Sequence, residues 1–234
     1  MIKDNIPVII NPLTHLFNLS ISSGIVPDKL KLAKVVPVYK NKCESCIPGN
    51  YRPISLLSVF DKLLEKVMYA RRYSYLQAHN ILYKYQFGFR KKYSTSMALI
   101  DFIEKNYQNQ NDGKLCAGVY IDLLKAFDTV NHDILLYKLH NYGICGVIYD
   151  WFRNYLTNRQ QYTCIGGVKS SIFCISCGVP QASVLWPLLF IIYVNDIGNA
   201  VPNLAINFLL MIQIFLSLMM SRVLREWQFM PFKH

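Results

Sequence analysis

An apolar run that stops at a carboxylate constrains this chain more than any other feature. Residues Cys116–Ile121 carry no charge and have the length of a buried strand, and Asp122 follows directly. A second carboxylate, Asp128, follows six residues later. Sheets commonly present chemistry at the ends of their strands, so the pattern predicts a strand with a functional site at its end. A strand followed by a helix whose aspartates cap its first turn fits the same spacing.

Helical and strand periodicities elsewhere predict a fold of the α+β class. Ser55 or Ser58 is placed to cap the longest predicted helix. Val35–Tyr39 has the composition of a strand, and Pro37 predicts an edge position for it because proline cannot donate to a ladder. The predicted helices cover Leu13–Ile21, the segment from the serine cap to about His79, Ser94–Tyr107, Leu135–Tyr142, Ile148–Leu156 and Leu185–Ile197.

The chain carries a large excess of positive charge. It has 25 Lys and Arg residues against 14 Asp and Glu, which gives a formal charge of +11 at pH 7. Such an excess favours a polyanion or an acidic membrane surface as partner. The seven cysteines are an odd number, and the first residues lack the charged leader and apolar core of a secretory signal. We therefore expect an intracellular protein, in the nucleus or the cytoplasm, and not a secreted one.

Cations gather at two places. Arg71 and Arg72 lie among tyrosines on the later turns of the longest predicted helix, and Arg90, Lys91 and Lys92 follow a glycine that permits a tight turn. Interleaved basic and aromatic residues can hold a nucleic-acid backbone and stack on bases. The three consecutive cations suit a triphosphate or a backbone phosphate. A solvated basic face and a charged hairpin tip are the structural alternatives.

Four motifs occur in the order that is typical of one family of polymerases. They are Tyr51-Arg-Pro-Ile-Ser, Gln86-Phe-Gly-Phe-Arg, Asp122-Leu-Leu-Lys-Ala-Phe-Asp-Thr-Val-Asn-His and Gly178-Val-Pro-Gln-Ala-Ser-Val-Leu-Trp-Pro-Leu-Leu-Phe. Together they resemble the reverse transcriptase domain of non-LTR (LINE-type) retrotransposons. The resemblance implies the fingers and palm of a right-hand polymerase, with an antiparallel palm sheet and RNA-directed DNA polymerase activity. It also implies an RNA template, a DNA primer and a dNTP as partners, Mg²⁺ as the metal, no small-molecule cofactor and no membrane.

The resemblance also implies roles for single residues. Asp122 would be the catalytic metal ligand, Phe127 would screen the sugar 2′ position, and Gln181 would lie beside the nascent base pair. Ala182 and Trp186 stand where the family motif has glycines, and each adds strain if its backbone needs a positive φ. The expected nucleotide-binding residues are Arg90, Lys91, Phe127 and Gln181, and the expected nucleic-acid contacts are Arg52, Arg71, Arg72 and Lys92.

The next motif of the family is missing. The family has a hairpin with Phe-Ala-Asp-Asp or Tyr-x-Asp-Asp, whose aspartates complete the metal site. Here Leu210 and Met211 stand at the two aspartate positions, and neither can bind a hard cation. Met codons end in G and every Ile codon begins with AT, so Met211-Ile212 always hides GAT, an aspartate codon in another frame. We therefore expect a frame slip just before Phe208, no thumb, and no catalysis by this copy.

The expected organisation has three parts. A fingers-like region with an N-terminal extension covers 1–112, a palm covers 113–207 with intervening helices at 133–157, and an out-of-frame apolar tail covers 208–234. One alternative function is a non-catalytic nucleic-acid-binding remnant that uses the basic fingers. Another is a protein tethered to a membrane through 204–220, where no residue is charged.

Overall fold

The structure is a computed structural model that describes residues 6–40, 46–121, 126–200, 205–208 and 214–220. The fold is α+β, as predicted. The chain divides into two compact units, one formed by residues 1–81 and 127–193 and the other by 82–126 and 194–234. The predicted boundaries of fingers, palm and tail stay predictions.

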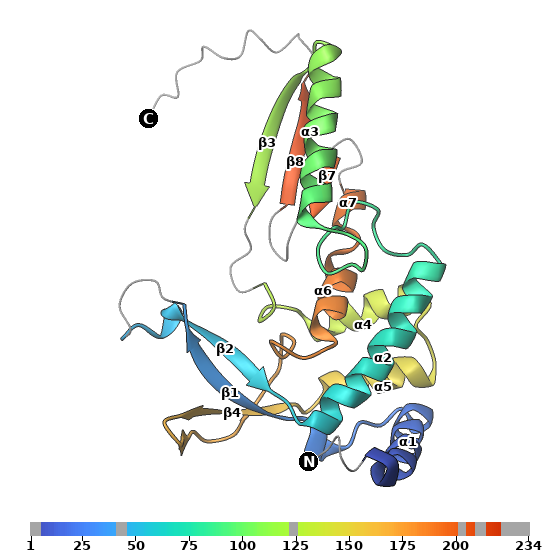
Figure 1. Ribbon diagram of the computed structural model, residues 1–234, viewed down its shortest axis with the longest axis vertical. Coiled ribbons are helices and arrows are strands. Elements are labelled where there is room, and N and C mark those ends of the chain that lie inside the picture. The colour runs from blue at the N-terminus through green and yellow to red at the C-terminus, as the bar shows by residue number, and fades with distance from the viewer. Residues whose placement is uncertain (1–5, 41–45, 122–125, 201–204, 209–213, 221–234) are drawn as a thin grey trace. The chain divides into compact units, whose positions relative to one another are not determined.

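The first unit combines one mixed sheet with helices (Figure 1). Two short 3-10 helices, at Asp28–Leu30 and Pro48–Asn50, lie in its connections. Its helices are α1 (Ile6–Ser23), α2 (Val59–Ala78), α4 (His132–Asn141), α5 (Val147–Leu156) and α6 (Trp186–Val194), and its strands are β1 (Leu32–Tyr39), β2 (Tyr51–Leu56), β4 (Gln160–Ile165), β5 (Val168–Lys169) and β6 (Phe173–Cys174).

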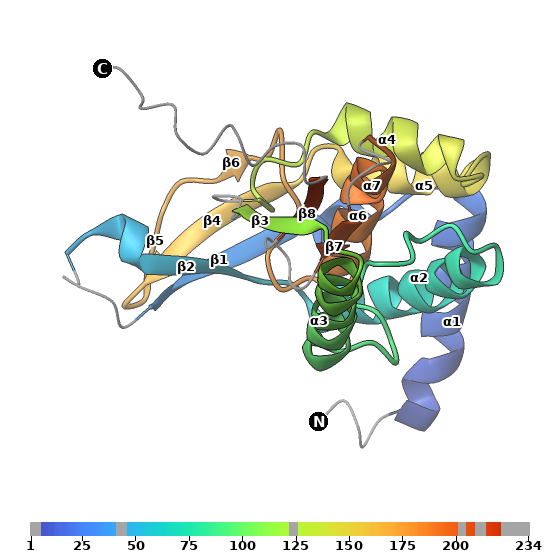
Figure 2. The same cartoon turned by 90° about the horizontal axis from the view of Figure 1, so that it is seen from above.

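Strand β1 lies inside this sheet, so the predicted edge position is wrong. The strand order is β2-β1-β4-β5, and β6 also pairs with β4 (Figure 2). The parallel pairing with β4 covers only Leu32–Val35, and Pro37 lies beyond it, opposite Pro53 of β2. Proline is tolerated there because no neighbour on the β4 side pairs with it and neither proline of the facing pair has an N–H to donate.

Helix α2 follows the sequence prediction closely. Ser58 is its N-cap and accepts a hydrogen bond from the backbone N–H of Asp61, while His79 is its C-cap. Helix α1 is longer than predicted and contains Pro12. It is joined to α5 in the core, where the indole N–H of Trp151 donates to the Ser20 hydroxyl at 3.1 Å.

The second unit contains the strand that precedes Asp122. Its elements are α3 (Thr95–Asn111), β3 (Leu115–Ile121), α7 (Ile197–Ala200), β7 (Ala205–Phe208) and β8 (Ile214–Met220). Strand β8 lies between β3 and β7 and is antiparallel to both, and α3 runs along this sheet (Figure 1). The predicted strand at Cys116–Ile121 and its place beside the next strand pair are therefore confirmed.

Helix α3 directly follows Ser94, the first residue of the predicted helix, and the described part of the apolar stretch at 204–220 forms strands. Ser94 caps α3 by accepting from the N–H of Met97. Within the part of the chain that the structure describes, no helix is both long and apolar enough to cross a membrane. Residues 205–208 and 214–220 of the proposed tether are strands.

Candidate functional site

Two of the sequence motifs meet in the first unit. The backbone N–H of Gly178 donates to the carbonyl of Val130 at 2.8 Å, and that of Val179 donates to the carbonyl of Phe127 at 3.1 Å. The Nε2 atom of His132 lies 2.7 Å from the Gly178 carbonyl oxygen. The start of the fourth motif is therefore held against the turn that follows the Asp122 strand in the sequence.

Gly178 cannot be replaced without moving this turn. Its φ is +81°, a left-handed conformation that favours glycine. A Cβ atom on it would lie 2.9 Å from the Asp128 Cα, the Asp128 carbonyl and the Phe127 carbonyl. The close approach of the two motifs therefore depends on the missing side chain.

Gln181 is bound by a residue of the same turn and by a residue of β2. Its side-chain Nε2 donates to Oδ1 of Asp128 at 3.0 Å, and its carbonyl accepts from the backbone N–H of Ser55 at 3.1 Å. Ser55 belongs to β2, so it is not the helix cap that the sequence allowed. Asp128 does not cap the following helix either, because Asn131 does so by accepting from the backbone N–H groups of the second and third residues of α4. The carboxylate of Asp128 instead orients Gln181.

Phe127 is nearly buried, with 8% of its surface exposed. Its ring meets those of Trp186 and Phe190 edge to face, with centroids 4.2 and 4.7 Å away. Trp186 is the first residue of α6 and has no positive φ, so the condition under which it would add backbone strain is not met. The indole that replaces a family glycine thus packs on the residue expected to screen the nucleotide sugar.

Ala182 does show the expected strain. It is exposed and has a φ of +72°, a left-handed backbone conformation that L residues rarely adopt. The strain lies next to Gln181, within the fourth motif.

Replacing Ala182 with glycine should relieve this strain. We expect Ala182→Gly to raise the free energy of unfolding by about 1 kcal/mol, measured by urea denaturation. The matched control is Ala70→Gly at an exposed position inside α2, which should lower stability by about 1 kcal/mol. Equal losses in the two variants would mean that Ala182 is not strained.

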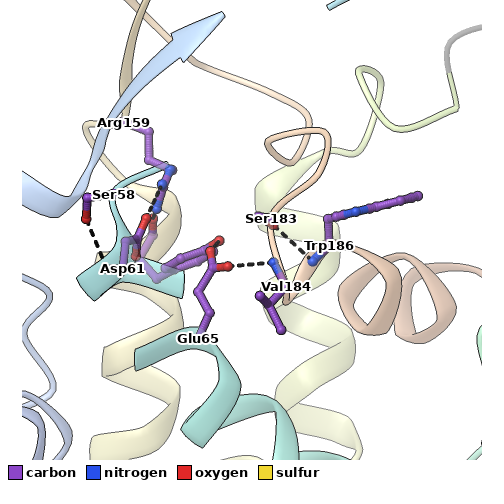
Figure 3. A network of polar contacts seen from close by, with 8 residues as sticks. Ser58, Asp61, Glu65, Arg159, Ser183, Val184 and Trp186 are labelled. Atoms are coloured by element: carbon purple, nitrogen blue, oxygen red, sulfur yellow. Dashed lines mark hydrogen bonds and ion pairs between the residues drawn. The ribbon is translucent and has the colours of Figure 1, made fainter. Parts of the chain in front are cut away.

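A buried polar cluster contacts the fourth motif at Val184 (Figure 3). The Glu65 carboxylate accepts hydrogen bonds from the Tyr155 hydroxyl and, at 2.6 Å, from the backbone N–H of Val184. Beside it, Arg159 forms a fully buried ion pair with Asp61 at 3.3 Å. The cluster was missed in the sequence, although Asp61 and Glu65 are four residues apart and so share a helix face.

Burial raises the pKa values of the cluster's acids. The pKa of Glu65 rises to about 7, first because burial disfavours the carboxylate and second because of the charge of Asp61, while Tyr155, Val184 and Arg159 oppose the rise. Burial also raises the pKa of Asp61 against the effect of Arg159. It raises the pKa of the Tyr155 phenol well above its usual value.

The raised pKa of Glu65 predicts a pH dependence of stability. Between pH 4.5, the ordinary value, and about pH 7, the folded state holds the Glu65 proton that the unfolded state has lost. Stability should therefore fall as pH rises through this window, by about 3 kcal/mol in total. Glu65→Gln should remove this loss, so its stability relative to the unchanged chain should rise from pH 4.5 to 8 in urea denaturation.

A surface substitution controls for the loss of one acid. Glu104→Gln removes an exposed carboxylate on α3. Its stability should follow the unchanged chain across the same pH range. If the Glu65→Gln curve also ran parallel to that of the unchanged chain, the carboxyl would not titrate in the core as described.

The expected phosphate-binding residues lie in the second unit. The Nη1 atom of Arg90 donates to the Tyr83 carbonyl oxygen at 2.9 Å. The guanidinium carbon of Arg90 lies 4.1 Å from the centroid of the Tyr93 ring. Lys91 and Lys92 are exposed, and Lys92 has a positive φ of +68°. Arg90 thus shapes the turn that presents the two lysines.

The other expected contacts lie in the first unit. Arg52 and Arg71 are exposed, and Arg72 is half-buried. Burial, and next the charge of Arg71, lower the pKa of Arg72. The structure brings Phe127 and Gln181 together in this unit, while Arg90 and Lys91 belong to the other.

The expected metal-binding positions fall outside the described residues. Asp122 directly follows Ile121, the last residue of β3, and Leu210 and Met211 lie between β7 and β8 in the sequence. At the flanks of these positions, Ile214 pairs with both Ile121 and Phe208. Among the residues that the structure describes, no group of three or more His, Cys, Asp or Glu side chains could hold a metal ion.

Comparison with known proteins identifies the family. Residues 38–217 match the family model described as "Reverse transcriptase (RNA-dependent DNA polymerase)". Since this match covers most of the chain, the protein belongs to the reverse transcriptase family. The resemblance seen in the motifs is confirmed at this level.

Curated relatives refine this membership. The chain is 30% identical over 190 residues to the RNA-directed DNA polymerase from mobile element jockey of Drosophila melanogaster, covering 81% of this chain and 21% of that protein. It is 31% identical over 185 residues to the probable RNA-directed DNA polymerase from transposon BS of the same species, covering 79% and 20%. The chain is thus similar to the reverse transcriptases of non-LTR retrotransposons and spans about a fifth of these relatives.

Solved structures support the fold. Apo telomerase from Candida tropicalis aligns with a TM-score of 0.59 at 10% identity, over 90% of this chain and 44% of that chain. A form truncated from the C-terminal domain aligns with a TM-score of 0.57 at 13% identity, over 90% and 49%. At such low identity the likeness shows a shared fold only.

Proposed function

We propose that this chain is the fingers and palm of a retrotransposon reverse transcriptase that binds primer–template without extending it. The family reaction adds a nucleotide to the 3′-hydroxyl of a primer on an RNA template. When bound, two divalent metal ions such as Mg²⁺ lower the charge on the attacking and leaving oxygens. Whether this chain keeps that chemistry depends on the metal ligands that its side chains supply.

One observation carries the loss of catalysis. The register pairs Ile214 with both Ile121 and Phe208 at one end of the sheet. In the sequence, the expected metal-binding positions directly follow Ile121 and lie between Phe208 and Ile214, and together they form the expected donor set. Asp122 supplies a carboxylate to this set, whereas Leu210 and Met211 supply alkyl and thioether groups. Mg²⁺ prefers oxygen ligands, so this donor set does not fit a pair of metal ions.

Residues in each of the two units, taken separately, support retained binding. Gln181 is held by Asp128 and by the backbone of Ser55. The exposed Lys91 and Lys92 follow the Arg90 turn and suit phosphate. Binding by these groups requires no metal, so it can persist where catalysis is lost.

A frame slip before Phe208 remains our explanation for the missing aspartates. The aspartate codon hidden in Met211-Ile212 supports it. Strand β8 is compatible with a frame slip, because the apolar run Ile214–Met220 has the composition of a strand whichever reading frame encodes it. The family match argues against an early slip, because it continues past Phe208 to residue 217.

The purified chain should bind an RNA–DNA primer–template and extend no primer. Binding, followed by fluorescence anisotropy, should weaken steeply as salt rises, because phosphate contacts release counterions. Primer extension with all four dNTPs should be absent with Mg²⁺ and with Mn²⁺. Extension that disappears in Asp122→Ala would refute the loss of catalysis.

A charge-matched pair of variants tests the binding surface. Lys91→Ala with Lys92→Ala should reduce the slope of log affinity against log salt by about 2. Lys29→Ala with Lys169→Ala removes two exposed cations elsewhere and should leave the slope unchanged. Adding Arg90→Ala tests the whole cluster, and circular dichroism checks that the variant chain still folds. An unchanged slope in the first pair would place the phosphate contact elsewhere.

A further inference from the structure

The segment from Gly178 to Trp186 is anchored at separate points along its length. Gly178 and Val179 donate to the turn at 127–130, and the Gln181 carbonyl accepts from Ser55. Within the segment, Ser183 donates its backbone N–H to the Pro180 carbonyl, and its hydroxyl accepts from the N–H of Trp186. The remaining anchor, at Val184, is of a different kind.

The Val184 anchor is a side chain from a distant helix. The Glu65 carboxylate reaches the Val184 N–H from α2, across 119 positions of sequence (Figure 3). Its other oxygen accepts from the Tyr155 hydroxyl of α5. Glu65 therefore links two helices of the first unit to the segment that carries Gln181.

Burial makes this link costly to break. Glu65 has no exposed surface, and a buried carboxylate oxygen that loses its donor loses much of its stabilisation. If the Val184 amide moved away, it would strand an oxygen in the core. The position of the segment and the energy of the buried acid are therefore coupled.

Backbone strain next to Gln181 adds a second reason for an anchor. Ala182 is held at φ +72°, a conformation that persists only where the surroundings impose it. The Ser55 contact lies before this residue and the Glu65 contact after it. The two anchors together fix the strained residue and the side chain of Gln181.

We propose that Glu65 is a positioning residue, which fixes the backbone at 181–184 and so holds Gln181 against the Phe127–Asp128 turn. The proposal rests on the proposed nucleotide-binding role of Gln181. Glu65 touches neither nucleotide nor metal in this account. It acts through the amide of Val184.

Amide hydrogen exchange of the free protein tests the positioning. Glu65→Ala should raise the exchange rates of the amides at 181–184 at least tenfold, with little change in β1. Glu65→Gln should restore most of the protection, because its amide oxygen can still accept from Val184. Leu76→Ala, at a fully buried position of the same helix, is the control for general destabilisation.

The exchange pattern decides between positioning and simple packing. The proposal is overturned if Glu65→Ala leaves the segment protected, if Leu76→Ala exposes it equally, or if Glu65→Gln fails to restore it. Because the protein carries no ligand in this experiment, the result does not depend on nucleic-acid binding. A chain that shows the predicted pattern but binds no primer–template would refute the proposed function and keep the role of Glu65.

A pH titration by NMR covers the case in which Glu65→Ala does not fold. The charged groups that face Glu65 are Asp61 of its own helix and Arg159, with the phenol of Tyr155 on α5. The Val184 amide proton should move downfield as pH rises through about 7, because its hydrogen bond strengthens when the acceptor becomes charged. This step should vanish in Glu65→Gln.

The nearby histidine is the control for this titration. The ring of His132 contacts the Gly178 carbonyl at the start of the same segment. The step at Val184 should persist in His132→Asn. A step that survives Glu65→Gln, or one that is lost in His132→Asn, would overturn the assignment to Glu65.

Discussion

The packing of Gly178 against the turn at 127–130 is the contact on which the candidate site depends. Two backbone hydrogen bonds and a left-handed glycine bring the fourth motif to the turn that carries Phe127 and Asp128. No Cβ fits between them. Without this contact, Gln181 would lose the carboxylate that orients it. The site therefore depends first on the close approach of two backbone segments and only then on the side chains that they carry.

The same segment is held in place by groups that cost stability. Burial disfavours the carboxylate of Glu65, and Ala182 has a backbone conformation suited to glycine. Both act on the residues that directly follow Gln181, because Ala182 is the next residue and Glu65 binds the N–H of Val184. Such costs are typical of positions whose geometry serves a site.

Local signals allowed much of the fold to be predicted from the sequence. Ser58 and the apolar run before Asp122 are features of a few consecutive residues, and both predictions hold. The misplaced features depend on distant partners. The edge position predicted from Pro37 is wrong because the pairing of β1 with β4 cannot be seen in the local sequence. The partner of Asp128 is a glutamine 53 positions away. The buried partners of Glu65 lie 90 and 119 positions away, so only the helical spacing of the acids could have indicated them.

Metal binding tests the central claim, that this reverse transcriptase chain has kept its nucleotide-side contacts and lost its metal pair. Electron paramagnetic resonance of Mn²⁺, titrated into the chain with primer–template and dNTP, distinguishes a single weak site from a pair of coupled ions. We predict no spin-coupled pair, because only Asp122 supplies a carboxylate where Leu210 and Met211 replace the others. A tightly bound Mn²⁺ pair that is lost in Asp122→Ala would contradict the account.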